Sequence, residues 1–96
     1  MGHNVRQVEE CKLILRNMIH ELKLNEEFFG DVLTGNKTFE VRINDRDYKV
    51  GDYLKLLSYD PKKQQYTGGE AKRKITYILH GGQYGIEKGF VVIGMQ

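Results

Sequence analysis

Hydrophobic and polar residues follow two different periods along the chain, and each change of period marks a new element. Between residues 4 and 18, apolar positions recur every three or four residues, as on one face of an amphipathic helix. They are Val5, Val8, Cys11, Leu15 and Met18. Asn4 and Gln7 supply the residue types of a helix N-terminus. The pattern predicts a helical N-terminal extension, residues 1–17, that either packs on its own domain or docks a partner or second copy.

The next two segments predict a short strand and a second helix. In "IHELKL", residues 19–24, His20, Leu22 and Leu24 alternate with more polar positions, which is typical of a strand with one buried face. "NEEFFGDVLTG" offers Asn25 as an N-cap and Gly35 as the end of the helix. The face of this helix predicted to be buried carries Phe28, Phe29, Val32 and Leu33.

After Gly35 the period changes to two, which predicts strands. In the first, one side carries Phe39, Val41 and Ile43, and the other carries Thr38, Glu40 and Arg42. Further strands are predicted at residues 53–60, 70–79 and 90–95, the last of them apolar and central. Closely spaced strands with few helices favour an α+β fold built on a small mixed or antiparallel barrel.

The totals place the chain among small soluble domains. Its 96 residues form one domain, and 40% apolar with 29% charged residues fits a globular chain rather than a disordered one. No apolar run approaches the roughly 18–20 residues of a membrane span. A single cysteine, Cys11, and no apolar signal segment predict a cytoplasmic protein. The net charge of +2 neither requires nor excludes an anionic partner.

One strand, within "GNKTFEVRINDR", concentrates charge where a core strand is expected. If its apolar side faces the core, Glu40 and Arg42 face solvent or a cleft, with Lys37 beside them. Such cations can bind a phosphate or carboxylate while the glutamate holds the arginine, or the glutamate can accept hydrogen bonds from a base. A solvated strand face with weak ion pairs has the same spacing. Spacing alone leaves these possibilities open.

A longer series of motifs resembles a known family. The ordered blocks run from Met18 to Gly94: His20-Glu21-Leu22-Lys23, Gly35-x-Lys37-x-x-Glu40-x-Arg42, Asn44-Asp45-Arg46, Val50-Gly51-Asp52, Tyr66-Thr67-Gly68, Tyr77-Ile78-Leu79 and Gly81-Gly82. They resemble ASCH domains of the PUA-like superfamily, and most closely a bacterial and phage branch of small ASCH-like proteins of unknown function. The resemblance implies a PUA-like β-barrel over residues 18–96, with a helix flanking a cleft lined by the second block.

The resemblance also implies RNA or a modified nucleoside as the partner, with no cofactor. The binding residues carried over or added from their chemistry are Lys37, Glu40, Arg42, Asn44, Arg46 and Tyr66. In this hypothesis the cations contact phosphate or a base edge, Glu40 orients them or contacts the base, and Tyr66 stacks. The three histidines lack the spacing of metal ligands, so no metal site is predicted.

Tyrosines also alternate with lysines between residues 48 and 66, and Lys72, Arg73 and Lys74 add a basic run. Aromatic rings among cations suit base stacking and phosphate contact. However, tyrosine also favours strands and lysine protects strand edges, so the pattern alone does not decide.

An enzymatic alternative comes from one ASCH branch that removes acyl groups from the exocyclic nitrogen of cytidine. That branch resembles this chain at Lys37, but it uses a threonine nucleophile three residues later and a later glutamate. Here that third position is Glu40, Thr38 is out of register, and Glu87 is the late glutamate. We therefore expect a binding module first. A hydrolase using Lys37, Glu40 and Glu87, or an interaction module using the N-terminal helix, are the alternatives.

Overall fold

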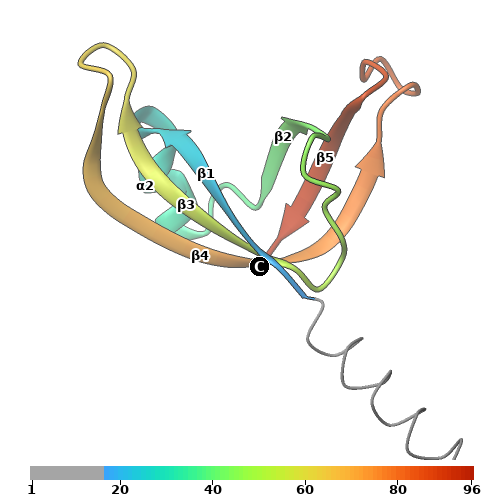
Figure 1. The fold of residues 1–96 in the computed structure, drawn as a ribbon, viewed down its shortest axis with the longest axis horizontal. Helices are drawn as coiled ribbons and strands as arrows, with labels where there is room; N and C mark the ends of the chain where they lie inside the picture. Colours follow the sequence, from blue (N-terminus) through green and yellow to red (C-terminus); the bar gives the residue numbers. More distant parts are fainter. Residues whose placement is uncertain (1–16) are drawn as a thin grey trace, which may run out of the picture.

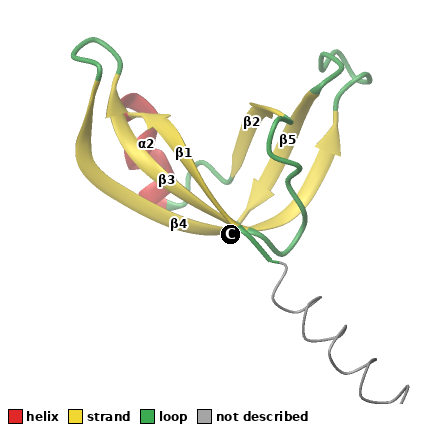
Figure 2. Cartoon of the chain, in the orientation of Figure 1, coloured by secondary structure: helices red, strands yellow, loops and turns green. Residues whose placement is uncertain are grey.

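The computed structural model describes residues 17–96, in which five strands form one mixed sheet (Figures 1 and 2). The elements are β1 (Ile19–Asn25), α2 (Glu26–Thr34), β2 (Phe39–Ile43), β3 (Tyr53–Asp60), β4 (Gln65–His80) and β5 (Phe90–Met95). The strand order is β1-β3-β4-β5-β2. Only the β1–β3 pair is parallel; the other neighbours are antiparallel. The predicted N-terminal helix lies outside the described residues.

The long strand β4 divides the sheet into two wings. Its first part pairs with β3 as far as Lys74, and its second part pairs with β5 from Ile75 onward. Figure 1 shows β4 bending where the two parts meet, so that β1 and β3 lie in one wing and β5 and β2 in the other. The inner faces of both wings contribute to one hydrophobic core: Leu22, Leu24, Val32, Tyr48, Leu54, Leu56, Ala71, Ile75, Val91, Ile93 and Met95.

Helix α2 packs on the inner face of the β1–β3–β4 wing. Val32 is fully buried, and the ring of Phe29 lies close to Gly69 of β4. The helix ends at Gly35, which has a φ of 83°, a conformation that glycine adopts without steric cost. Arg73 of β4 then donates from Nη2 to the Val32 carbonyl at 3.0 Å. This contact places a positive charge at the negative end of the helix dipole.

Most predicted elements are confirmed, although two features differ. The alternation of β1 is as expected, with His20, Leu22 and Leu24 buried. The interior position of β5 is also confirmed. Strand β4 begins earlier than predicted and includes "QYTGG". Half of the predicted buried face of α2 is wrong, because Phe28 and Leu33 are 40% and 54% exposed on a helix that presents only a narrow stripe to the sheet.

The prediction of a closed barrel is wrong. Strands β1 and β2 are the two edges of an open sheet and do not pair with each other. Closure requires every strand to have two neighbours, and the period of a sequence cannot reveal whether two distant edges meet. The α+β class and the mixed sheet hold. No helix in the described part of the chain is long and apolar enough to cross a membrane.

The orientation of β2 is the opposite of the one considered first. Phe39, Val41 and Ile43 are about half exposed, with values of 47%, 52% and 58%, whereas Glu40 is only 4% exposed. Glu40 pairs with Ile93 on the inner face of the sheet. The charged side of this strand therefore faces the interior, where a carboxylate needs partners.

Candidate functional site

The two edge strands of the open sheet flank a cavity of about 500 Å³. On one side it is lined by the end of β1 and the start of α2, and on the other side by β2 and the residues before it. The lining residues are Lys23, Leu24, Asn25, Phe28, Lys37, Phe39, Glu40, Val41 and Arg42. All three charged residues of the G-x-K-x-x-E-x-R motif thus line one cleft.

Glu40 is the buried centre of this cleft. Its Oε1 accepts a hydrogen bond from Lys37 Nζ, and its Oε2 accepts one from Arg42 Nε at 2.9 Å. Charge-assisted hydrogen bonds of this kind are about twice as strong as neutral ones. Because both carboxylate oxygens are occupied by cations, Glu40 is placed to orient Lys37 and Arg42.

The two cations have further contacts that fix them at the cavity wall. Lys37 Nζ donates to the Phe39 carbonyl at 2.6 Å and lies 4.8 Å from the centre of the Phe39 ring. Arg42 Nη2 donates to the Lys23 carbonyl on β1 at 2.6 Å. A guanidinium carries five N–H groups, so Arg42 has donors left for a ligand after these contacts.

A second cavity of about 290 Å³ continues along β1 and brings Arg46 and Tyr66 to the same region. Its lining residues are Glu21, Leu22, Lys23, Arg42, Arg46, Leu57 and Tyr66. Arg46 Nη1 donates to the Glu21 carbonyl at 2.8 Å. Two arginine side chains therefore span the opening between the edge strands. Tyr66 is 54% exposed, so a ligand can reach its ring.

The remaining candidate residues lie apart from the charged centre. Asn44 Oδ1 accepts a hydrogen bond from the Tyr48 amide at 3.4 Å, and its own amide donates to the Gly89 carbonyl at 2.8 Å. Asn44 thus shapes the turn after β2. Glu87 is exposed in the loop between β4 and β5, and it lines neither of the two cavities. The structure does not bring Glu87 to Lys37 and Glu40.

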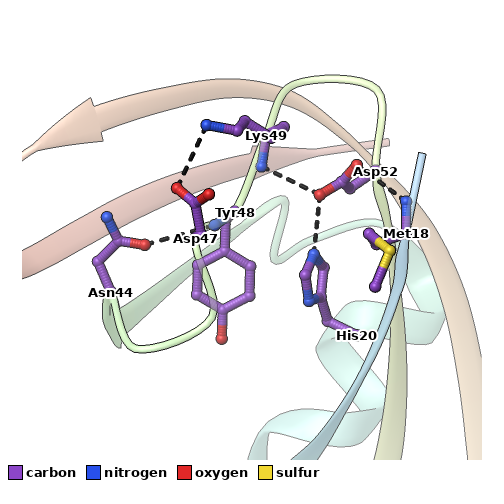
Figure 3. A network of polar contacts seen from close by, with 7 residues as sticks. All are labelled: Met18, His20, Asn44, Asp47, Tyr48, Lys49 and Asp52. Carbon is purple, nitrogen blue, oxygen red and sulfur yellow. Dashed lines mark hydrogen bonds and ion pairs between the residues drawn. The ribbon is translucent and has the colours of Figure 1, made fainter. Parts of the chain in front are cut away.

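A second buried carboxylate, Asp52, was not among the predicted site residues (Figure 3). It is 1% exposed and accepts hydrogen bonds from the Met18 amide at 3.0 Å and the Lys49 amide at 3.1 Å. His20 Nε2 lies 2.8 Å from its Oδ2. Burial acts to raise the pKa of Asp52, but the hydrogen bonds from His20 and the two amides outweigh it, so that the pKa is lowered.

The same network includes Tyr48, whose ring meets His20 edge-on at 4.8 Å (Figure 3). Burial raises the pKa of Tyr48, although the charge of Arg46 opposes the shift. The sequence did indicate that His20 needs a polar partner. It lies on the same face of its strand as Leu22 and Leu24, and a buried polar ring is normally hydrogen-bonded. Nothing in the spacing identified Asp52 as that partner.

Within residues 17–96, no three His, Cys, Asp or Glu side chains come together as a group that could hold a metal ion. The cleft itself presents two oriented cations, Lys37 and Arg42, around the Glu40 carboxylate.

Comparison with known proteins gives a family and one curated relative. A family model described as "Domain of unknown function (DUF3850)" matches residues 19–95. The "Uncharacterized 12.9 kDa protein in GpA 3'region" of Escherichia phage P2 is 40% identical over 60 residues. That alignment covers 62% of this chain and 53% of the relative, so the chain spans about half the length of the phage protein. Since the family model covers most of the chain, the protein belongs to the DUF3850 family.

Proposed function

We propose that the cleft between β1 and β2 binds the phosphate or polar base edge of RNA or of a modified nucleoside. The observation that carries this proposal is the arrangement of Lys37 and Arg42, which a buried carboxylate holds at the wall of a cavity of about 500 Å³. Cations fixed before binding lose little side-chain freedom when a ligand arrives. Arginine in particular presents several donors to a planar anion.

The neighbouring residues favour a nucleotide over a simple anion. Arg46 and the exposed ring of Tyr66 share the adjoining cavity with Arg42. An aromatic ring close to guanidinium groups can stack a base while the cations contact its phosphate. The proposed relation to the ASCH domains is supported by the same geometry, because the motif residues line a cleft that begins at α2. The open sheet departs from the barrel of that fold.

Binding is favoured over hydrolysis by the state of Glu40. A general base must come within hydrogen-bond reach of the proton that it removes. Both oxygens of Glu40 are directed at Lys37 and Arg42, and Glu40 is only 4% exposed. Thr38 is exposed beside the cleft, and the position used by the nucleophile in the hydrolase branch is Glu40 itself. We therefore propose that Glu40 positions the cations.

The test is a titration of the full chain with cytidine 5′-monophosphate, a short single-stranded RNA and N4-acetylcytidine, followed by amide-resolved NMR. We expect shifts at Lys37, Glu40, Arg42 and Arg46. We expect Arg42→Gln to weaken RNA binding at least about tenfold, or roughly 1.4 kcal/mol. Lys88→Gln, an equal charge change in the loop after β4, is the control and should change affinity less than about twofold.

Three outcomes would overturn the proposal. Equal weakening by Arg42→Gln and Lys88→Gln would mean that only net charge matters. Absence of binding by all three ligands would remove the nucleic-acid function. Release of acetate from N4-acetylcytidine that is lost in Lys37→Ala would replace binding with hydrolysis. The amide spectrum of each variant shows whether the fold is retained.

A further inference from the structure

The outer face of the β1–β3–β4 wing gathers tyrosines and lysines that are dispersed in the sequence. In antiparallel pairs, residues directly opposite each other lie on the same face of the sheet. Tyr53 lies opposite Lys74, and Tyr59 lies opposite Tyr66. With Lys23 of β1, which lies opposite the outer residue Leu57, these positions form what we name the tyrosine–lysine face: Lys23, Tyr53, Tyr59, Tyr66, Lys72 and Lys74.

Two of the tyrosines hold lysines on this face. Lys72 Nζ lies 4.8 Å from the centre of the Tyr53 ring, and Lys23 Nζ lies 4.4 Å from that of Tyr59. Cation–π contacts at such distances are attractive. The Tyr66 ring meets Tyr59 edge-on at 5.2 Å and remains 54% exposed. Tyr53 and Tyr59 thus position charge, while Tyr66 offers an aromatic surface.

Basic residues outnumber acidic residues on the outer face of this wing. Two acidic residues on the same side of the sheet, Glu21 and Glu70, both lie 3.6 Å from Lys55, which offsets one of their two negative charges. The positive charges of Lys23, Lys72 and Lys74 outweigh the remaining one. Among the described residues, Lys72 and Lys74 have no carboxylate within 4.0 Å. Arg73 between them points to the opposite face, where it contacts α2. The alternation of β4 therefore directs the two lysines outward.

The tyrosine–lysine face is continuous with the cleft across β1. The cavity of about 290 Å³ is lined by Arg42 and Arg46, which reach β1 from the cleft side. It is also lined by Lys23, Leu57 and Tyr66, which belong to the outer face. A flexible chain of anions that passes from the arginines to the lysines runs beside Glu21, which lines the same cavity, and Glu70, which lies opposite Leu57. Both carboxylates are 3.6 Å from Lys55, so a cation lies between them.

We propose that the tyrosine–lysine face is a second contact surface for single-stranded nucleic acid, which runs from the cleft across β1 onto β3 and β4. A base stacks on Tyr66, and phosphates of the following nucleotides contact Lys72 and Lys74. Single strands fit this surface because their bases are free to stack on protein rings, whereas a duplex hides its base faces. The inference rests on the proposed function for the class of ligand and shares Tyr66 with it, but its phosphate contacts, Lys72 and Lys74, are different residues.

The test compares strand lengths. Fluorescein-labelled oligouridine and oligodeoxythymidine of two and eight nucleotides are titrated with the full chain, and anisotropy is measured at several salt concentrations. We expect the eight-nucleotide strands to bind more tightly. The double variant Lys72→Gln, Lys74→Gln should weaken their binding about tenfold and lower the salt slope by about 1.4, because two phosphate contacts with a single strand are lost. It should leave dinucleotide binding within about twofold.

The matched control is Lys49→Gln, Lys88→Gln, which removes the same charge from two exposed lysines in loops outside β1, β3 and β4. If the control weakens the eight-nucleotide strands equally, or if length has no effect, the second surface does not exist. If the face variant weakens binding while Arg42→Gln does not, the face stands and the cleft proposal fails. If no strand binds, both fail. The RNA and DNA arms show whether the 2′-hydroxyl contributes.

Discussion

Asp52 and Glu40 are both buried carboxylates with their oxygens hydrogen-bonded, yet their surroundings differ. Asp52 is 1% exposed and accepts two backbone amides and His20. Glu40 is 4% exposed and accepts only side-chain cations, Lys37 and Arg42. Asp52 lines none of the three cavities along the edge strands, whereas Glu40 lines the largest of these three.

The difference lies in the donors. A backbone amide has one hydrogen, so the amides of Met18 and Lys49 are satisfied once they reach Asp52. Lysine and arginine have several, so Lys37 and Arg42 can bind Glu40 and a ligand together. Burial of a carboxylate therefore does not identify a binding site by itself. A buried carboxylate that holds cations at the wall of a cavity does point to one.

The comparison first predicts that removing Asp52 harms the fold most. Asp52→Ala leaves the Met18 and Lys49 amides and His20 without their acceptor, at a cost of about 1–3 kcal/mol for each group that stays buried. We expect a total loss of about 3 kcal/mol in the free energy of unfolding, measured by urea denaturation with circular dichroism. Asp45→Ala, at an exposed position, is the control and should change stability by less than about 0.5 kcal/mol. Equal losses would contradict the structural role.

The second prediction separates the two carboxylates by their response to anions. Glu40→Gln keeps the shape but leaves Lys37 and Arg42 without the carboxylate between them, and we expect a loss of about 2 kcal/mol. Added phosphate should recover part of this loss at constant ionic strength, because an anion that binds only the native state stabilises it. Asp52→Asn should show no such recovery in urea unfolding. Recovery in both variants, or in neither, would remove the distinction.

A third prediction concerns acid. The pKa of Asp52 in the folded protein is below its usual value of 3.8, so its ionised form stabilises the native state above about pH 4. That contribution is lost as the pH falls through the folded-state pKa. The difference in unfolding free energy between the wild type and Asp52→Asn should therefore shrink from pH 5 to pH 2. One proton limits its slope to about 1.4 kcal/mol per pH unit. Urea unfolding at each pH measures it, and a constant difference would contradict the assignment.

The sequence predicted the positions of the strands better than it predicted which face of each strand is buried. The alternation of His20, Leu22 and Leu24 identified β1 and its buried face because apolar side chains occupy most of that face. In β2 the same rule failed, since alternation shows that a strand has two faces but not which one is covered. Pairing with β5 places Glu40 opposite buried Ile93, and these two residues are more than fifty positions apart in the sequence. Local patterns contain no information on such a pair.

The roles of particular glycines and charged residues became clear only from the residues that they contact in the structure. The predicted strand began only at residue 70, yet "YTGG" belongs to β4. Gly69 leaves room for the Phe29 ring, since an added Cβ would come 2.8 Å from it. The motif spacing suggested that Lys37, Glu40 and Arg42 act together, and the structure brings them to one cleft. It could not predict that Arg42 and Arg46 reach carbonyls of β1, because the position of that edge depends on the whole sheet.

The smallest expected effect concerns those two arginines. Arg42 donates hydrogen bonds both to Glu40 and to the Lys23 carbonyl of β1. Arg46 donates to the Glu21 carbonyl of β1 but not to Glu40, and its side chain is 45% exposed. Arg42→Lys should cost about 1 kcal/mol of stability, because lysine cannot make both contacts, and Arg46→Lys less than about 0.5 kcal/mol.

Hydrogen exchange of the β1 amides would measure the same contacts locally, because weakened fastening of the edge strands should speed local opening. Both variants should accelerate exchange in β1, and Arg42→Lys more strongly. If neither variant accelerates exchange, the two arginines do not stabilise the contact between the edge strands β1 and β2. Their hydrogen bonds to β1 then only hold the guanidinium groups in position for a ligand.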